Sequence, residues 1–325
     1  MRQNIRLIAY YCLALLTLSA VYLIPPAFSF TPLESHILMQ LKLPVLVTAI
    51  MVGTSIAGAS ACLQVLLRNP LADPGIIGIS SGASLLAATF ILLSGTSAGA
   101  VLGINALSSS AYALPILCFI GAFASSLLIF MLAKWMGGAV SSVILAGIAI
   151  STLCSALIAW MFLVAGPNQL QSLTFWLMGS LNNTTWQSLT FSMPIVIVSL
   201  LVLFTRLKPL NQLYLGEQCA TLAGVNTKRF QTQALLLVSL LVGVSVSVAG
   251  SIAFLGLLVP HFVRRLHGNN NQLVVPIAAI LGAIVMVVCA IVNAQFSKIS
   301  LPISMLTASI GAPLFIYVMV KGRSA

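Results

Sequence analysis

Few residues of this chain could perform acid–base or metal chemistry. Its 325 residues include three acidic side chains, Glu34, Asp73 and Glu217, and none lies in the middle of a long apolar stretch. His261 has no second histidine, cysteine or carboxylate at a chelating spacing, so we expect it to have a capping or interfacial role rather than to bind a metal. The GxxxxGK[ST] and HExxH motifs are missing. The sequence therefore predicts no catalytic site, no metal site and no cofactor in this chain.

The distribution of charge also limits how the chain could obtain energy for transport. Transporters that use a proton or sodium gradient usually carry costly polar or charged groups inside the membrane. Such carboxylates are missing here. We therefore expect energy to come from a partner protein.

The elements that must position these residues are membrane helices. Apolar residues make up 60% of the chain and charged residues 5%, against roughly 25% charged in a soluble domain. A spanning helix needs about 20 mostly apolar residues, and the long runs do not alternate as barrel strands would. We predict an all-α polytopic protein with one domain over residues 1–325 and about ten spans. These spans are 5–24, 43–67, 76–94, 111–133, 140–165, 189–205, 233–250, 252–263, 273–293 and 303–320.

Two details of these spans can be checked. The segment 252–263 is short, follows Gly250 and ends at Pro260, so we expect a broken helix packed inside protein. Small residues at four-residue spacing, such as Gly53 and Gly243, predict close helix contacts. The six cysteines are scattered without a CxxC pair, and we interpret them as packing residues.

The basic residues predict the orientation, because Lys and Arg accumulate in cytoplasmic loops. If the N-terminus is inside, twelve of the 14 basic residues are cytoplasmic, and only Lys42 and Lys298 face outward. Both termini are then cytoplasmic. The net charge of +11 follows from this topology, so no nucleic-acid partner is expected.

A rigid loop is predicted between the second and third spans. Asp73 could cap the next helix, and Pro74 could occupy its first position, where a missing N–H costs nothing. On local physics alone, an ordinary tight turn explains the loop as well.

Several motifs in order along the chain resemble the FecCD-type permeases, the ABC importer family for ferric siderophores, haem and cobalamin. They are NPLADPGIIGISSGA at 69–83, LAG at 145–147 with Ser151, FWLMG at 175–179, GSIAFLGLLVPH at 250–261, and LPI at 301–303 with Thr307 and GAP at 311–313. The residues that we assign to these motifs as structural are Asn69, Pro70, Asp73, Pro74, Gly75, Gly256, Pro260, His261, Gly311 and Pro313.

The resemblance implies a ten-helix subunit with defined partners. These are a second permease subunit, two cytoplasmic ATPases that bind ATP and Mg, and an extracytoplasmic substrate-binding protein. A cytoplasmic coupling loop near 208–230 is similar to the short helices that enter a cleft of the ATPase. Its matching residues are Leu215, Gly216, Glu217, Ala220 and Gly224. The alternative is a solvated turn in which Glu217 caps a helix.

The outer face departs from the family pattern. The family commonly docks its binding protein on basic residues, and here Lys42 and Lys298 are the candidates. Val45, Asn293 and Ser297 replace charged residues of the pattern, which puts docking strength in question. Either lysine could instead extend toward lipid headgroups.

The resemblance implies the permease subunit of a binding-protein-dependent ABC importer in a bacterial cytoplasmic membrane. We expect alternating access, walls that are mostly apolar and hydroxylic, and an iron(III)-siderophore as the substrate. Haem and cobalamin are the alternatives within the family. A secondary transporter or channel without ATPases, or a structural membrane subunit, are the alternatives outside it. Whether the permease pairs with itself or with a different chain stays open.

Overall fold

The computed structural model describes residues 2–24, 32–75, 77–94, 96–101, 103–108, 110, 112–138, 140–182, 184–296 and 301–322. Every regular element within these residues is helical, so the all-α prediction is confirmed. Lys298 and Ser297 lie outside the described residues.

A helix overlaps each of the ten predicted spans. The helices are α1 (Arg2–Leu23), α3 (Leu43–Leu66), α4 (Ile79–Leu93), α7 (Ala113–Trp135), α8 (Val140–Val164), α10 (Trp186–Thr205), α13 (Thr227–Ala249), α14 (Leu255–His267), α15 (Asn271–Gln295) and α16 (Ile303–Gly322). Seven helices in the described part of the chain are long and apolar enough to cross a membrane, and α4 and α16 are shorter apolar helices. The polytopic membrane architecture is confirmed, while the count of ten spans stays a prediction.

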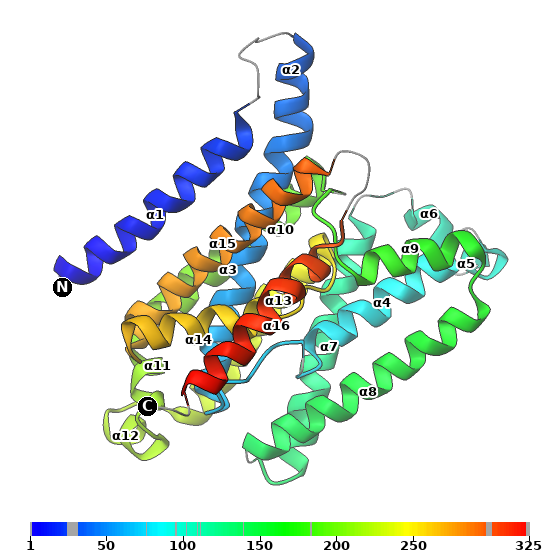
Figure 1. The fold of residues 1–325 in the computed structure, drawn as a ribbon. Helices are drawn as coiled ribbons and strands as arrows, with labels where there is room; N and C mark the ends of the chain where they lie inside the picture. The colour runs from blue at the N-terminus through cyan, green and yellow to red at the C-terminus, as the bar shows by residue number, and fades with distance from the viewer. Residues whose placement is uncertain are drawn as a thin grey trace.

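Short helices connect the long ones and have no counterpart among the predicted spans, because an apolar-run criterion does not detect them. They are α2 (Pro32–Ile37), the π-helical segment η1 (Leu38–Lys42), α5 (Ser97–Val101), α6 (Ile104–Ser108), α9 (Pro167–Leu177), α11 (Leu207–Tyr214) and α12 (Glu217–Leu222). In Figure 1, α11 and α12 lie at the same end as the start of α1, and α5, α6 and α9 lie at the opposite end.

Several helices begin in polar caps outside the apolar runs. The Asn226 side chain accepts a hydrogen bond from the Arg229 N–H (3.1 Å) at the start of α13, and Thr185 does the same for Ser188 (3.3 Å) at the start of α10. These caps satisfy N–H groups that no intrahelical carbonyl can reach. The helices therefore start three to six residues earlier than the predicted spans at 189 and 233.

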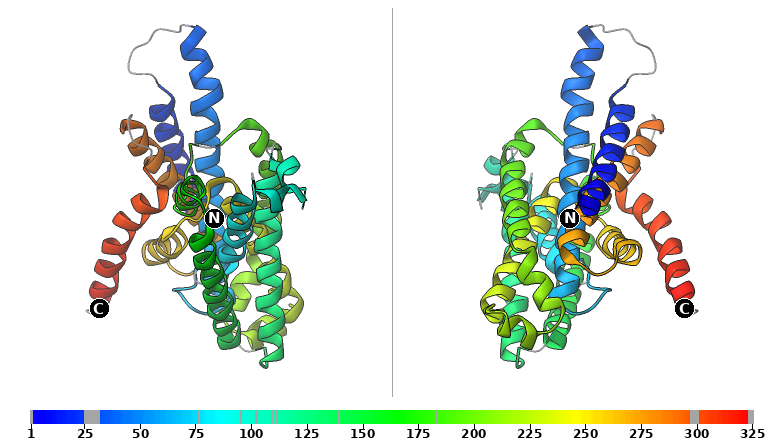
Figure 2. Two further views of the ribbon diagram at one scale, coloured as in Figure 1. Left: turned by 90° about the vertical axis from the view of Figure 1, so that its right-hand side faces the viewer. Right: turned by 90° about the vertical axis from the view of Figure 1, so that its left-hand side faces the viewer.

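Helix α3 forms the centre of the bundle and is buried along most of its length. It packs closely on α15, because Gly53 and Gly282 face each other and a Cβ on either would overlap the other backbone. Gly243 likewise meets Ala122 of α7, so the close contacts predicted at Gly53 and Gly243 are confirmed, whereas Ser251 lies beyond the end of α13. Figure 1 shows α1 at one edge of the bundle, and Figure 2 shows α16 extending away from the rest of it.

The cysteines match their predicted role with one exception. Cys62, Cys118, Cys154 and Cys289 are buried, and Cys12 is half-buried. Cys219 is exposed, so its packing assignment is wrong. It lies on α12, which projects from the bundle.

Candidate functional site

The loop between α3 and α4 is held by its own side chains. Asp73 Oδ1 accepts a hydrogen bond from the Gly75 N–H (2.7 Å), and Asn69 Oδ1 accepts one from the Leu71 N–H (2.9 Å). Asp73 therefore closes its own turn and does not cap α4, which corrects the prediction. Helix α4 begins only at Ile79, after Gly78 in a left-handed conformation (φ +85°). For the same reason Pro74 occupies the turn and not a first helical position.

The chain unwinds between α13 and α14. Helix α13 ends at Ala249, residues 250–254 are not helical, and α14 begins at Leu255. Phe254 has a left-handed backbone (φ 65°), which is unusual for a side chain of this size. A broken helix with a buried face is thus confirmed.

The predicted end of this helix at Pro260 is wrong, because Pro260 lies inside α14, which continues to His267. Packing of α14 against α3 and α15 holds the helix through the proline. His261 consequently lies in the interior of α14 beside the Phe315 ring of α16, with 6.2 Å between ring centroids. This position excludes the capping role.

The two strongest sequence motifs meet at Gly256. A Cβ on Gly256 would lie 2.5 Å from Asp73 Oδ2 and would overlap the Ser60 hydroxyl of α3. Only glycine lets α14 approach the Asp73 loop this closely. The structure therefore brings Asp73, Gly75 and Gly256 together, although they are far apart in the sequence.

Hydrogen bonds join the segments at and beside the 175–179, 250–261 and 301–303 motifs. These run from Ser180 N to Ala249 O (2.9 Å), from Ile303 N to Gly179 O (3.0 Å), from Ser304 N to Met178 O (3.2 Å) and from Ser304 Oγ to Ser251 O (2.6 Å). They satisfy backbone groups that a broken helix leaves unpaired. In addition, Gly311 packs directly against Phe254, and Pro313 lies within α16.

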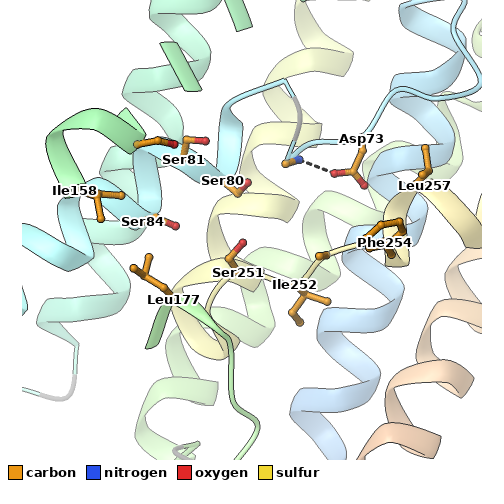
Figure 3. Close-up of a pocket in the computed structure, with 13 residues that line it drawn as sticks. Asp73, Ser80, Ser81, Ser84, Ile158, Leu177, Ser251, Ile252, Phe254 and Leu257 are labelled. Carbon is orange, nitrogen blue, oxygen red and sulfur yellow. Dashed lines mark hydrogen bonds between the residues drawn. The ribbon is translucent and has the colours of Figure 1, made fainter. Parts of the chain in front are cut away.

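A cavity of about 520 Å³ opens where these segments meet (Figure 3). Asp73 is its one charged lining residue, and Ser80, Ser84 and Ser251 present hydroxyls to it. The remaining lining residues are Gly75, Ser81, Ser155, Ile158, Leu177, Ile252, Ala253, Phe254 and Leu257. The wall is thus mostly hydroxylic and apolar, and we interpret this cavity as the candidate substrate site.

The sequence analysis did not assign the serines that line this cavity. Ser80 and Ser81 lie within the 69–83 motif, and Ser84 follows one turn later on α4. Ser81 Oγ is 2.8 Å from Ser151 Oγ of α8, which links two motifs. The close spacing of these serines on one apolar helix could have indicated a hydroxyl-lined cavity. Serines on membrane helices also serve helix packing, so the pattern is not specific.

The predicted coupling residues form a short helix that projects from the bundle. Leu215 is 71% exposed, and Gly216 and Gly224 adopt positive φ angles (128° and 82°) on either side of α12. Ala220 is the buried residue of α12. Glu217 starts α12, and its Oε1 accepts a hydrogen bond from Gln231 Nε2 of α13 (2.9 Å). The segment is therefore anchored to α13, while its role in coupling stays a prediction.

The residues predicted at the outer face lie in different environments. Lys42 ends η1, with its Nζ 3.5 Å from the Tyr22 carbonyl and 6.0 Å from the centre of the Tyr22 ring. Val45 is buried in α3. Asn293 is also buried, and its Oδ1 accepts a hydrogen bond from the Leu301 N–H (3.0 Å). The family departures at Val45 and Asn293 thus fall on packing positions and not on an exposed docking surface.

No group of three metal-ligating side chains is present among the described residues. A broken helix beside a cavity inside a bundle of membrane helices is an arrangement found in transport proteins. The comparisons with known proteins make this class specific. The model of the FecCD transport family matches residues 6–321, and the chain belongs to this family.

Its relatives are permeases of import systems. The vitamin B12 import system permease protein BtuC of Vibrio parahaemolyticus is 35% identical over 92% of this chain and 87% of that protein. The hemin transport system permease protein HmuU of Yersinia pestis is 33% identical over 89% and 84%. The "Probable siderophore transport system permease protein YfhA" of Bacillus subtilis is 34% identical over 90% and 84%.

A solved structure has the same fold. It is assigned to the metal-chelate type ABC transporters in an inward-facing conformation, with a TM-score of 0.86, 29% identity, and coverage of 97% of this chain and 99% of that one. The chain is therefore an integral membrane permease of the ABC importer type.

Proposed function

We propose that this chain is the permease subunit of a binding-protein-dependent importer that moves an iron(III)-siderophore into the cytoplasm by alternating access. The observation that carries this proposal is the hydroxyl-lined cavity of about 520 Å³ beside the unwound residues 250–254. Because the relatives' names cover vitamin B12 and hemin as well as siderophores, cobalamin and haem are the alternative chelates.

The chemistry of the cavity suits a metal that is already wrapped in an organic ligand. Serine hydroxyls donate and accept hydrogen bonds, and Ile252, Phe254 and Leu257 offer apolar contact. Asp73 Oδ1 is engaged by the Gly75 N–H (2.7 Å). A chelate held by such groups would bind without exchanging its metal, and it could leave again once the cavity opens inward.

A continuous mechanical path links α12 to this cavity. The Glu217–Gln231 hydrogen bond (2.9 Å) and the bond from the Val225 N–H to the Ala220 carbonyl (3.0 Å) attach α12 to the start of α13. Helix α13 is unbroken over 23 residues and ends directly at the unwound segment. A force on α12 would therefore move residues 250–254 through one rigid helix.

Each proposed partner has candidate contact residues in this chain. Two ATPase subunits, which hold ATP and Mg, would contact α12 through the exposed side chains of Leu215 and Leu222. A substrate-binding protein would dock near Lys42 and Lys298. A second permease subunit, identical or different, would cover exposed apolar residues such as Met305 and Ile310 of α16. The assembly would lie in a bacterial cytoplasmic membrane with both termini of this chain inside.

Uptake of labelled chelates tests the proposal. Cells with and without this gene are given ferric siderophores, haem and cobalamin, with and without ATP depletion. We expect deletion to abolish ATP-dependent uptake of one chelate. Uptake that survives ATP depletion but collapses with the ion gradient would identify a secondary transporter, and unchanged uptake of all three would refute an importer of these chelates.

A further inference from the structure

A second cavity lies apart from the substrate cavity, at the end of the bundle that carries α12, and Gly224 beside α12 is one of its lining residues. Its volume is about 420 Å³. It lies between the junction of α10 with α11 and the start of α13, and Arg206 and Arg229 line it together with Asn226 and Gln233. None of its lining residues is acidic, so the cavity is a concave basic site.

Neither guanidinium is neutralised within the described part of the chain. Arg206 and Arg229 are both exposed, and the hydrogen bond at Arg229 uses its backbone N–H, not its side chain. The positive end of the 23-residue helix α13 faces the same region, because Asn226 is its N-cap. Two forked donors of this kind match the oxygens of a phosphate group.

The cavity adjoins the end of an apolar helix. Between α10 and α13 the side chains of Leu203, Phe230 and Ala234 are buried, so the helices pack closely there. Arg206 directly follows α10, whose exposed side chains include Val198 (60%) and Leu201 (59%). The basic cavity therefore lies at the end of a helix with exposed apolar side chains of the kind that meet lipid chains.

We propose that this cavity binds the headgroup of an anionic phospholipid, with the phosphate between Arg206 and Arg229 and the acyl chains along the exposed apolar side chains of α10. Basic pockets between membrane helices on the cytoplasmic side bind such headgroups. A free phosphate would use the arginines but not the apolar surface of α10. This inference needs only that the chain lies in a bilayer, so it stands independently of the proposed substrate.

Native mass spectrometry of the delipidated full-length protein tests the site. The protein is titrated with phosphatidylglycerol and, separately, with phosphatidylcholine of the same chains. We expect tighter binding of phosphatidylglycerol by roughly 10- to 30-fold, since each basic residue near the headgroup contributes a few-fold. The double variant R206Q/R229Q should lose this preference.

Matched controls separate the site from general surface charge. The variant K208Q/K228Q removes the same charge from the neighbouring positions, which are exposed and do not line the cavity, and should keep the preference. The melting temperature of each variant shows that it is folded.

Three results would overturn the proposal. Equal loss of preference in both double variants would indicate diffuse charge, and an unchanged preference in R206Q/R229Q would place the lipid elsewhere. Complete displacement of the lipid by millimolar inorganic phosphate would assign the cavity to a free anion. Loss of ATPase co-purification with an intact lipid preference would assign the arginines to the ATPase contact instead.

Discussion

The contact between Gly256 and Asp73 allows a sharp test of how the site is built. In Gly256→Ala the new methyl group would lie 2.5 Å from Asp73 Oδ2, whereas ordinary contact begins at about 3.4 Å. The same methyl group would overlap the Ser60 hydroxyl, so the Asp73 and Ser60 side chains must move by about 1 Å or α14 must move away from them. Overpacking of this size typically costs about 1–3 kcal/mol.

The movement should also affect transport. The Asp73 loop and residues 252–254 line opposite parts of the same cavity, so separating them changes its shape. We expect Gly256→Ala to lower the melting temperature of the purified protein and to reduce ATP-dependent uptake severalfold at equal membrane abundance. The assay pairs thermal unfolding in detergent with chelate uptake in cells.

A matched control is available in the same bundle. Gly58 also lies within a helix, but a Cβ there would meet its nearest neighbours at 3.6 and 3.7 Å. Gly58→Ala should thus be neutral or slightly stabilising, since alanine favours helix by about 1 kcal/mol. In a double-mutant cycle, Asp73→Ala should relieve about 1 kcal/mol of the Gly256→Ala cost. Wild-type stability and uptake in Gly256→Ala would refute the close-contact argument.

Three further predictions follow from the described contacts. Glu217→Ala or Gly216→Trp should abolish ATPase co-purification without affecting membrane insertion, because α12 loses its bond to α13 or its turn at φ 128°; pull-down of the ATPase from membranes measures this, and normal recovery would contradict the coupling role. Lys42→Glu should weaken binding-protein association, more strongly at low salt, where charges are less screened. An affinity that changes neither with the substitution nor with salt would indicate that Lys42 extends toward lipid headgroups instead. Ser251→Trp should fill the cavity and lower uptake at least tenfold while the ATPase still co-purifies, and uptake that persists would move the substrate path elsewhere.

Much of the membrane architecture could be predicted from the sequence. Hydrocarbon burial requires long apolar runs, and this requirement is local, so the long helices appear directly in the residue pattern. The break near Gly250 was predicted for the same reason, since a short apolar run next to glycine and serine cannot span alone. The boundaries were less accurate, because caps such as Asn226 lie outside the apolar runs.

The candidate site depended on tertiary structure. Asp73 and Gly256 are separated by most of the chain, and no local pattern states that they touch. The sequence suggested that Asp73 caps a helix, whereas the left-handed Gly78 lets it close its own turn. Asn293 looked like a lost docking charge, yet its burial and its bond to Leu301 make it a structural residue.

The sequence by itself determined the class of protein, its helical membrane fold and the motifs of the FecCD family, because apolar length and residue order are properties of the chain alone. The tertiary structure decided which motifs meet, which serines share the cavity and where two arginines flank a second one. Those facts depend on helix packing between residues distant in sequence, where backbones approach closely only at positions such as Gly53 and Gly256.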